Sequence, residues 1–66
     1  MKVEMNGEVI DLVAGSTLDD LCRLLALPKK SAVISVNGEV VRKSEYGSYV
    51  VPDSSKIEVM VFVGGG

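Results

Sequence analysis

Apolar and charged residues alternate over residues 1–5, which is the period-2 pattern of a strand with one buried face. Asn6 and Gly7 follow directly, and this dipeptide favours a two-residue type I′ hairpin turn. An extended pattern resumes over residues 8–13. The first 13 residues therefore predict a β-hairpin.

The pattern changes to a helical period after Gly15. Four apolar residues then fall at i, i+3, i+4 and i+7, on one face of a helix: Leu18, Leu21, Cys22 and Leu25. Ser16 or Thr17 is suited to cap the N-terminus of this helix. Pro28 cannot continue it, so we expect the helix to end at about Leu27.

A second hairpin is predicted after the helix. Residues 32–36 are mostly β-branched, and they are followed by Asn37 and Gly38, a second dipeptide of the type I′ turn. Residues 39–41 form the expected return strand.

The last third of the chain combines an irregular connection with the most apolar strand. Residues 42–48 show no sustained period, and we expect a short strand at residues 49–51 before a turn at residues 52–55. Alternation returns over residues 57–63, and its apolar character predicts the central strand of the sheet. The order of these elements predicts an α+β fold, a mixed sheet with one amphipathic helix packed on one face.

Composition agrees with a small globular domain that folds without help from a metal or a disulfide. The chain has 66 residues, 47% of them hydrophobic, with no histidine and a single cysteine. Cys22 lies on the apolar face of the predicted helix, where a cysteine behaves as a small hydrophobic residue. We expect a structural role for it and no bound cofactor.

The charge pattern excludes several classes of partner. The net charge is −2, and no cluster of Lys and Arg is interleaved with aromatic residues, so nucleic acid is not an expected partner. The sequence contains no apolar run of the length of a signal peptide core or a membrane span. We expect a cytoplasmic protein that does not bind membranes.

The end of the sequence carries the candidate chemistry. Gly64, Gly65 and Gly66 follow the last strand without a polar linker. Glycine lets the backbone enter spaces too narrow for a Cβ atom, and three extended residues carry the last carboxylate about 10 Å past the strand. Transfer of that carboxylate to the α-phosphate of ATP would activate it, and a sulfur nucleophile would then give a thiocarboxylate. A frayed terminus without function is the simpler alternative.

Motifs of an independent enzyme are absent from the sequence. There is no histidine, no nucleophile elbow, no phosphate-binding loop and no pair of cysteines. We expect a non-catalytic protein whose terminal group is modified by a partner enzyme.

Four segments carry a resemblance to a known family. They are the opening strand with its Asn-Gly turn, the helix entry at residues 14–18 with Leu21, the hairpin at residues 36–41, and the ending at residues 62–66. In these segments the chain resembles the ThiS family, the sulfur-carrier proteins of thiamin biosynthesis. The resemblance implies a β-grasp, ubiquitin-like domain at residues 1–63 and a flexible glycine tail at residues 64–66.

The resemblance also implies partners and a reaction. An E1-like enzyme of the ThiF type would adenylate Gly66 with ATP, and a sulfur donor protein would supply sulfur for the thiocarboxylate. A thiazole synthase of the ThiG type would then take up the sulfur. The sequence departs from the family pattern at Arg42 and Lys43, at residues 53–55, and at Tyr46, where a tryptophan is common.

The alternation in the last strand predicts a docking surface for these partners. If Ile57, Val59, Val61 and Val63 face the helix, Met60 and Phe62 lie on the open face of the sheet. We expect Met60, Phe62 and residues 63–65 to contact the adenylating enzyme, although Met60 and Phe62 could instead only cover neighbouring strands.

Three other functions remain open from the sequence. The chain could serve molybdopterin synthesis as the small subunit of molybdopterin synthase, which shares the fold and the Gly-Gly end. It could be a protein modifier, with Gly66 joined to a lysine of a target. It could also be an interaction module with an inert tail.

Overall fold

The computed structural model describes residues 1–62. Its strands and single α-helix are β1 (Lys2–Met5), β2 (Glu8–Asp11), α1 (Leu18–Leu24), β3 (Ala32–Val36), β4 (Glu39–Val40) and β5 (Lys56–Val61). Two short 3₁₀ helices, Lys29–Ser31 and Lys43–Glu45, lie in the connections.

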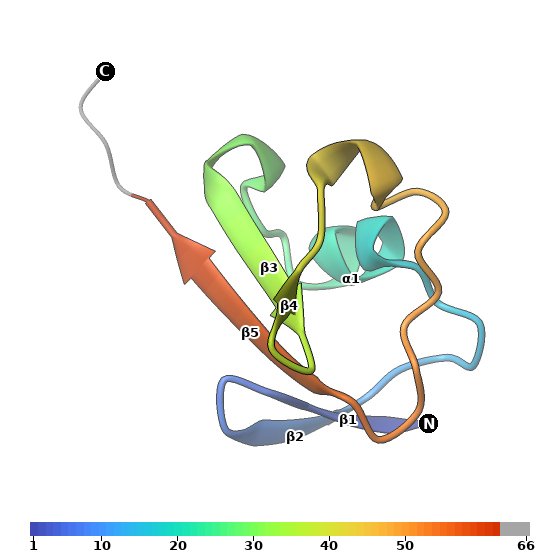
Figure 1. Cartoon of the computed structure of the whole chain (residues 1–66). Coiled ribbons are helices and arrows are strands. Elements are labelled where there is room, and N and C mark those ends of the chain that lie inside the picture. The colour runs from blue at the N-terminus through green and yellow to red at the C-terminus, as the bar shows by residue number, and fades with distance from the viewer. Residues whose placement is uncertain (63–66) are drawn as a thin grey trace.

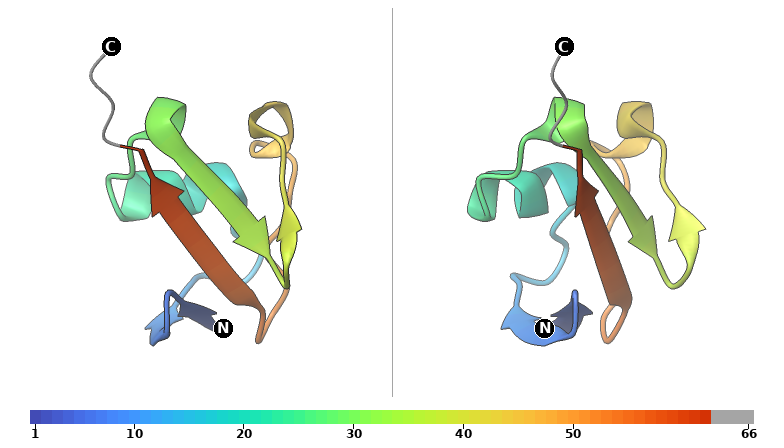
Figure 2. Two further views of the ribbon diagram at one scale, coloured as in Figure 1. Left: turned by 60° about the vertical axis from the view of Figure 1, so that its left-hand side comes forward. Right: turned by 90° about the vertical axis from the view of Figure 1, so that its left-hand side faces the viewer.

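The strands form one mixed sheet with β5 at its centre. The order is β2-β1-β5-β3-β4, in which β5 is parallel to β1 and antiparallel to β3 (Figure 1). Helix α1 lies across one face of the sheet, as the turned views show (Figure 2). This is the β-grasp arrangement, and both the α+β fold and the central position of the last strand are confirmed.

Both predicted hairpins are present with the expected turns. Asn6 and Gly7 have φ values of 48° and 86°, and Asn37 and Gly38 have 51° and 86°, the positive values that a type I′ turn requires. The second strand of each hairpin is shorter than the sequence predicted. Strand β2 ends at Asp11 and not at residue 13, and β4 ends at Val40 and not at residue 41.

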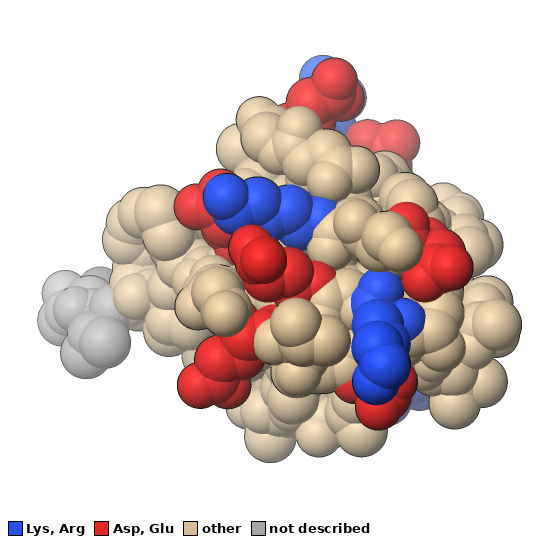
Figure 3. Space-filling model, turned by 90° about the horizontal axis from the view of Figure 1, so that it is seen from below, with Lys and Arg blue, Asp and Glu red and all other residues tan. Residues whose placement is uncertain are grey.

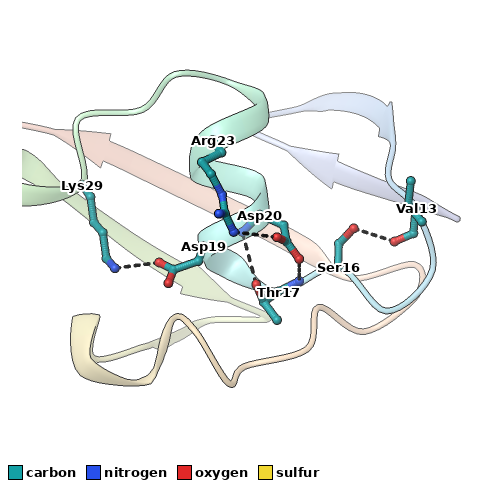
Figure 4. A network of polar contacts seen from close by, with 7 residues as sticks. All are labelled: Val13, Ser16, Thr17, Asp19, Asp20, Arg23 and Lys29. Atoms are coloured by element: carbon teal, nitrogen blue, oxygen red, sulfur yellow. Dashed lines mark hydrogen bonds and ion pairs between the residues drawn. The ribbon is translucent and has the colours of Figure 1, made fainter.

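Helix α1 begins at a capping box. Thr17 is the N-cap, its hydroxyl accepts from the Asp20 N–H at 3.2 Å, and its own N–H donates to Asp20 Oδ2 at 2.9 Å (Figure 4). Arg23 also donates to Asp20, while Lys29 reaches back to Asp19 at 2.7 Å. The choice between Ser16 and Thr17 as the cap is thereby settled.

The helix ends three residues before the predicted position, and that prediction was wrong. Ala26 takes a positive φ of 51°, and the N–H of Leu27 donates back to the carbonyl of Cys22 at 2.9 Å. These features close the last turn in the manner of a Schellman motif. The backbone reversal at Ala26 thus ends the helix before Pro28 can.

The core lies between α1 and the covered face of the sheet. Its buried members come from every layer of the domain: Val3, Leu12, Leu18, Leu21, Cys22, Ile34, Val36, Tyr46, Val51 and Ile57. The strand predicted at residues 49–51 is wrong, since only a single bridge joins Thr17 to Val50. Tyr46, in the segment predicted to be irregular, is 1% exposed.

The Tyr46 side chain bonds to the backbone of β3 beyond the end of β4. Strand β4 ends at Val40, and the Tyr46 hydroxyl accepts from the buried N–H of Ile34 at 3.3 Å. A polar group that would otherwise be buried without a partner is satisfied in this way. Burial raises the pKa of the Tyr46 phenol, and the Ile34 N–H partly opposes that shift.

Acidic and basic side chains are mixed on the lower face of the molecule. In the view from below, acidic residues lie around and between two basic strips, without a large field of either sign (Figure 3). Within residues 1–62, no helix is long and apolar enough to cross a membrane.

Candidate functional site

Strand β5 carries the chain towards the predicted reactive end. Five residue pairs join it to β3, from Val36↔Ile57 to Ala32↔Val61, and two join it to β1, Glu4↔Lys56 and Met5↔Ile57. The strand is therefore held from both sides at its start and from the β3 side at its end.

Two asparagine side chains add to this attachment. Asn6 Oδ1 accepts from the N–H of Val59 at 2.9 Å, and Asn6 Nδ2 donates to the carbonyl of Val59 at 3.2 Å. On the other flank of β5, Asn37 Oδ1 accepts from the N–H of Lys56 at 2.9 Å. The sequence predicted these asparagines as turn residues only, and nothing in a linear pattern reveals which distant strand a turn contacts.

The side chains of β5 follow the predicted alternation only in part. Ile57 is fully buried and Val59 packs partly buried against the core, as predicted for the helix side. Val61 differs, because 44% of it is exposed. Strand β1 pairs with β5 no further than Ile57, so among the described residues only β3 flanks β5 at Val61.

Met60 and Phe62 are on the surface, 59% and 56% exposed. Met60 stands opposite Val33 of β3, and the Phe62 N–H donates to the carbonyl of Ser31 at 2.8 Å. The backbone beneath both side chains is thus fixed while the side chains remain accessible. The other four predicted site residues, Val63, Gly64, Gly65 and Gly66, lie outside the described residues.

Cys22 is buried, as the sequence predicted. Only 6% of the residue is exposed. Burial raises the pKa of its thiol, and the Asp19 carboxylate adds to the shift while Lys29 opposes it. A thiol in this state has little of the thiolate form that reacts.

Potential metal ligands do not gather on the described part of the chain. Residues 1–62 contain no group of three or more Cys, Asp or Glu side chains placed to hold a metal ion.

Comparison with known proteins identifies the family. The sequence model of the ThiS family matches residues 3–66, nearly the whole chain and all of the glycine tail. The chain belongs to the ThiS family. This membership covers the central strand and the residues that follow it.

Curated relatives of this ThiS-family chain carry two different names. Thiazole synthase of Magnetococcus marinus is 36% identical and that of Paramagnetospirillum magneticum 35%, over all 66 residues of this chain in both cases. The chain spans about a fifth of the length of these two relatives. Sulfur carrier protein ThiS of Escherichia coli is 23% identical, and the match covers 100% of both chains.

Solved structures agree with the fold. The crystal structure of the thiamine biosynthesis protein ThiS of Geobacter metallireducens matches with a TM-score of 0.81 at 23% identity, over 100% of both chains. The solution structure of a thiamine biosynthesis protein from the same organism matches with a TM-score of 0.79 at 25% identity, over the whole of this chain and 88% of the other. Both similarities support the β-grasp arrangement.

Proposed function

We propose that this ThiS-family chain is a sulfur carrier of thiamin biosynthesis and that its working group is the carboxylate of Gly66. One observation carries the proposal: the family match runs from Val3 through the glycine tail, the segment that the chemistry needs. The relative named sulfur carrier protein ThiS, matched over the full length of both chains, supports it.

The proposed chemistry takes place in two steps on the terminal carboxylate. A carboxylate oxygen attacks the α-phosphorus of ATP, and pyrophosphate leaves to give an acyl-adenylate. A sulfur nucleophile then attacks the acyl carbon and AMP leaves. Hydrosulfide gives the thiocarboxylate directly, whereas a persulfide donor requires a second thiol to cleave the S–S bond. The carrier is a cosubstrate in these steps, and ATP binds to the partner enzyme.

The proposed function requires three partner proteins. An E1-like adenylating enzyme of the ThiF type would activate Gly66, and a thiazole synthase of the ThiG type would receive the sulfur. The second is supported by the two relatives named thiazole synthase, in which a segment similar to this chain is part of a longer protein. A sulfur donor protein completes the set.

The decisive experiment is the intact mass of the chain after incubation with ATP, the adenylating enzyme of the same organism and a sulfur donor. We expect one oxygen to be replaced by sulfur at Gly66, and fragmentation of the product locates the exchange. A chain with one alanine added after Gly66 is the control and should remain unmodified. Unchanged mass of the natural chain would contradict the proposal, and a chain joined to a lysine would instead indicate a protein modifier.

We further propose that Met60 and Phe62 dock on the adenylating enzyme. Both side chains are exposed on β5, directly before the tail, and their backbone is fixed by β3. Phe62→Ser should weaken the complex with the enzyme about tenfold, since buried aromatic side chains dominate many interfaces. The matched control is Val13→Ser, which changes an 81% exposed apolar residue away from β5. Equal affinity of the two variants would refute the docking role.

A further inference from the structure

Strand β5 forms backbone hydrogen bonds along more of its length on the β3 side than on the β1 side. Backbone groups of successive strand residues point to opposite edges. The Phe62 N–H points towards β3, where it donates to Ser31, and both backbone groups of Val59 point the other way, towards Asn6. Val61, two residues after Val59, therefore directs its N–H and C=O to the side of β1.

No described residue pairs with the backbone of Val61 on that side. The parallel ladder with β1 stops at Ile57, and the Asn6 side chain extends it by one step, to Val59. Val61 is the next step, and within residues 1–62 its N–H and C=O have no hydrogen-bond partner. The edge of the central strand thus opens at Val61.

This open edge lacks the features that usually protect sheet edges. Exposed edges are commonly blunted by shortness, charge or proline. Strand β4 has only two residues, and β2 carries an acidic residue at each end, Glu8 and Asp11. The last part of β5, by contrast, reads Val59, Met60, Val61 and is followed by Phe62, with no charge or proline.

We propose that the edge of β5 at Val61 is a strand-addition site, where an extended segment of the adenylating enzyme pairs with the Val61 backbone beside the glycine tail. This inference rests on the proposed function, which names that enzyme as the protein that takes up Gly66. The incoming segment adds main-chain hydrogen bonds to the sheet, and its alternate side chains meet the exposed Met60 and Phe62 on one face and Val61 on the other.

The chemistry of the tail favours this kind of recognition. Three glycines offer a partner no side chain, so a partner that selects them must bind their N–H and C=O groups. A segment that pairs with the Val61 backbone would bind main-chain groups of the same kind.

Hydrogen exchange at single amides tests the site directly. In the free chain the Val61 amide should exchange at least about tenfold faster than the Phe62 amide, which is bonded to Ser31. In the saturated complex with the enzyme, Val61 should become protected by about tenfold or more. Unchanged exchange of Val61 in that complex would overturn the proposal.

Proline substitution removes the donor from the edge. Val61→Pro deletes an N–H that bonds to no residue in the described range 1–62, and a strand edge facing outwards tolerates proline. We expect the complex to weaken about tenfold. Val9→Pro is the matched control, since Val9 stands on edge strand β2 opposite Glu4, and it should change the affinity less than twofold. Val61→Ala keeps the N–H and reports the contribution of the side chain alone.

The results separate this inference from the proposed function. A thiocarboxylate formed without protection of Val61 overturns the strand-addition site only. Protection of Val61 without a thiocarboxylate overturns the sulfur-carrier proposal only. Protection that appears in the free chain as its concentration rises, together with dimers in sedimentation, shows a second copy on the edge and contradicts our assignment. If Val61→Pro does not fold, the exchange measurement on the natural chain decides.

Discussion

The Asn6 side chain joins the turn of the first hairpin to the central strand β5 by two hydrogen bonds, and a substitution can remove both. Its amide bonds to both backbone groups of Val59, at 2.9 Å and 3.2 Å, in the way that a peptide group of a longer β1 would. Asn6→Gly removes both hydrogen bonds. The variant keeps the turn, because glycine adopts the φ of 48° at this position without strain.

The cost of Asn6→Gly follows from the number of bonds. A hydrogen bond of this kind contributes about 1 kcal/mol net, so the two together contribute about 2 kcal/mol. The greater freedom of glycine in the unfolded chain adds about 0.5–1 kcal/mol at most. Asn37→Gly is the reference variant for the loss of stability. It removes one side-chain hydrogen bond, to Lys56, from the same kind of turn, in which Asn37 has a φ of 51°.

Thermal and urea unfolding of the natural chain and the two variants provide the assay. Two bonds, about 2 kcal/mol, correspond to a fall in Tm of roughly 8–16 °C for a domain of this size, and Asn37→Gly should lower the Tm by about 4–8 °C less than Asn6→Gly does. Both glycine variants carry the same change in unfolded-state freedom, so their difference reports the additional bond. Equal Tm values for Asn6→Gly and Asn37→Gly would refute the reasoning.

Three further predictions concern the core and the helix. Tyr46→Phe leaves the buried N–H of Ile34 without its acceptor and should cost about 1–2 kcal/mol in chemical unfolding, whereas an unchanged free energy of unfolding would show that the 3.3 Å contact contributes nothing. The Thr17 N–H and hydroxyl lower the pKa of the Asp20 carboxyl, so its contribution to stability is complete above the ordinary carboxyl pKa and is lost as the pH falls through the lowered value. Asp20→Asn should therefore lower the Tm at neutral pH, with a difference from the natural chain that shrinks as the pH falls through the lowered pKa of this carboxyl; a difference independent of pH would contradict this. Because burial raises the pKa of the Cys22 thiol, a disulfide reagent should modify the folded chain only through unfolding, and rapid modification in native buffer would contradict the buried position.

The parts of the fold that were predicted correctly depend on local chemistry. Both Asn-Gly turns need positive φ at two adjacent residues, which few other dipeptides supply, and both hairpins are present. The helical spacing from Leu18 to Leu25 correctly identified α1 and its buried face. The strongly apolar alternation of the last strand correctly predicted that β5 is central.

The parts that were missed depend on contacts between distant residues. Tyr46 is buried, and its hydroxyl accepts from the N–H of Ile34 while the carbonyl of Ile34 accepts from Val41; no period in the sequence signals such a contact. The helix ends through a backbone reversal at Ala26, a residue that rarely adopts positive φ, so the sequence placed the end at the proline instead.

The sequence predicted the exposure of two residues of the candidate site but not the open strand edge beside them. The run of three glycines predicted the reactive end, and the alternation of the last strand correctly placed Met60 and Phe62 on the surface, away from the buried Ile57. The open edge at Val61 could not be predicted, because it depends on where β1 stops relative to β5. Register between a first and a last strand is a property of the folded sheet.

The attachments of β5 bear directly on how a partner would bind it. A frayed strand would have to be ordered on binding, at about 1–2 kcal/mol per backbone residue. Strand β5 is already extended in the free domain. Backbone pairing with β3 holds it as far as Val61, and the side chains of Asn6 and Asn37 bond to Val59 and Lys56, so the entropy of ordering this strand is lost during folding and not on binding. The same asparagine that extends the pairing to Val59 also ends it there, so within residues 1–62 Val61 is paired with β3 on one side and has an open edge on the other. Strand addition needs this combination, because a mobile edge lacks a fixed register and a covered edge has no groups left to pair.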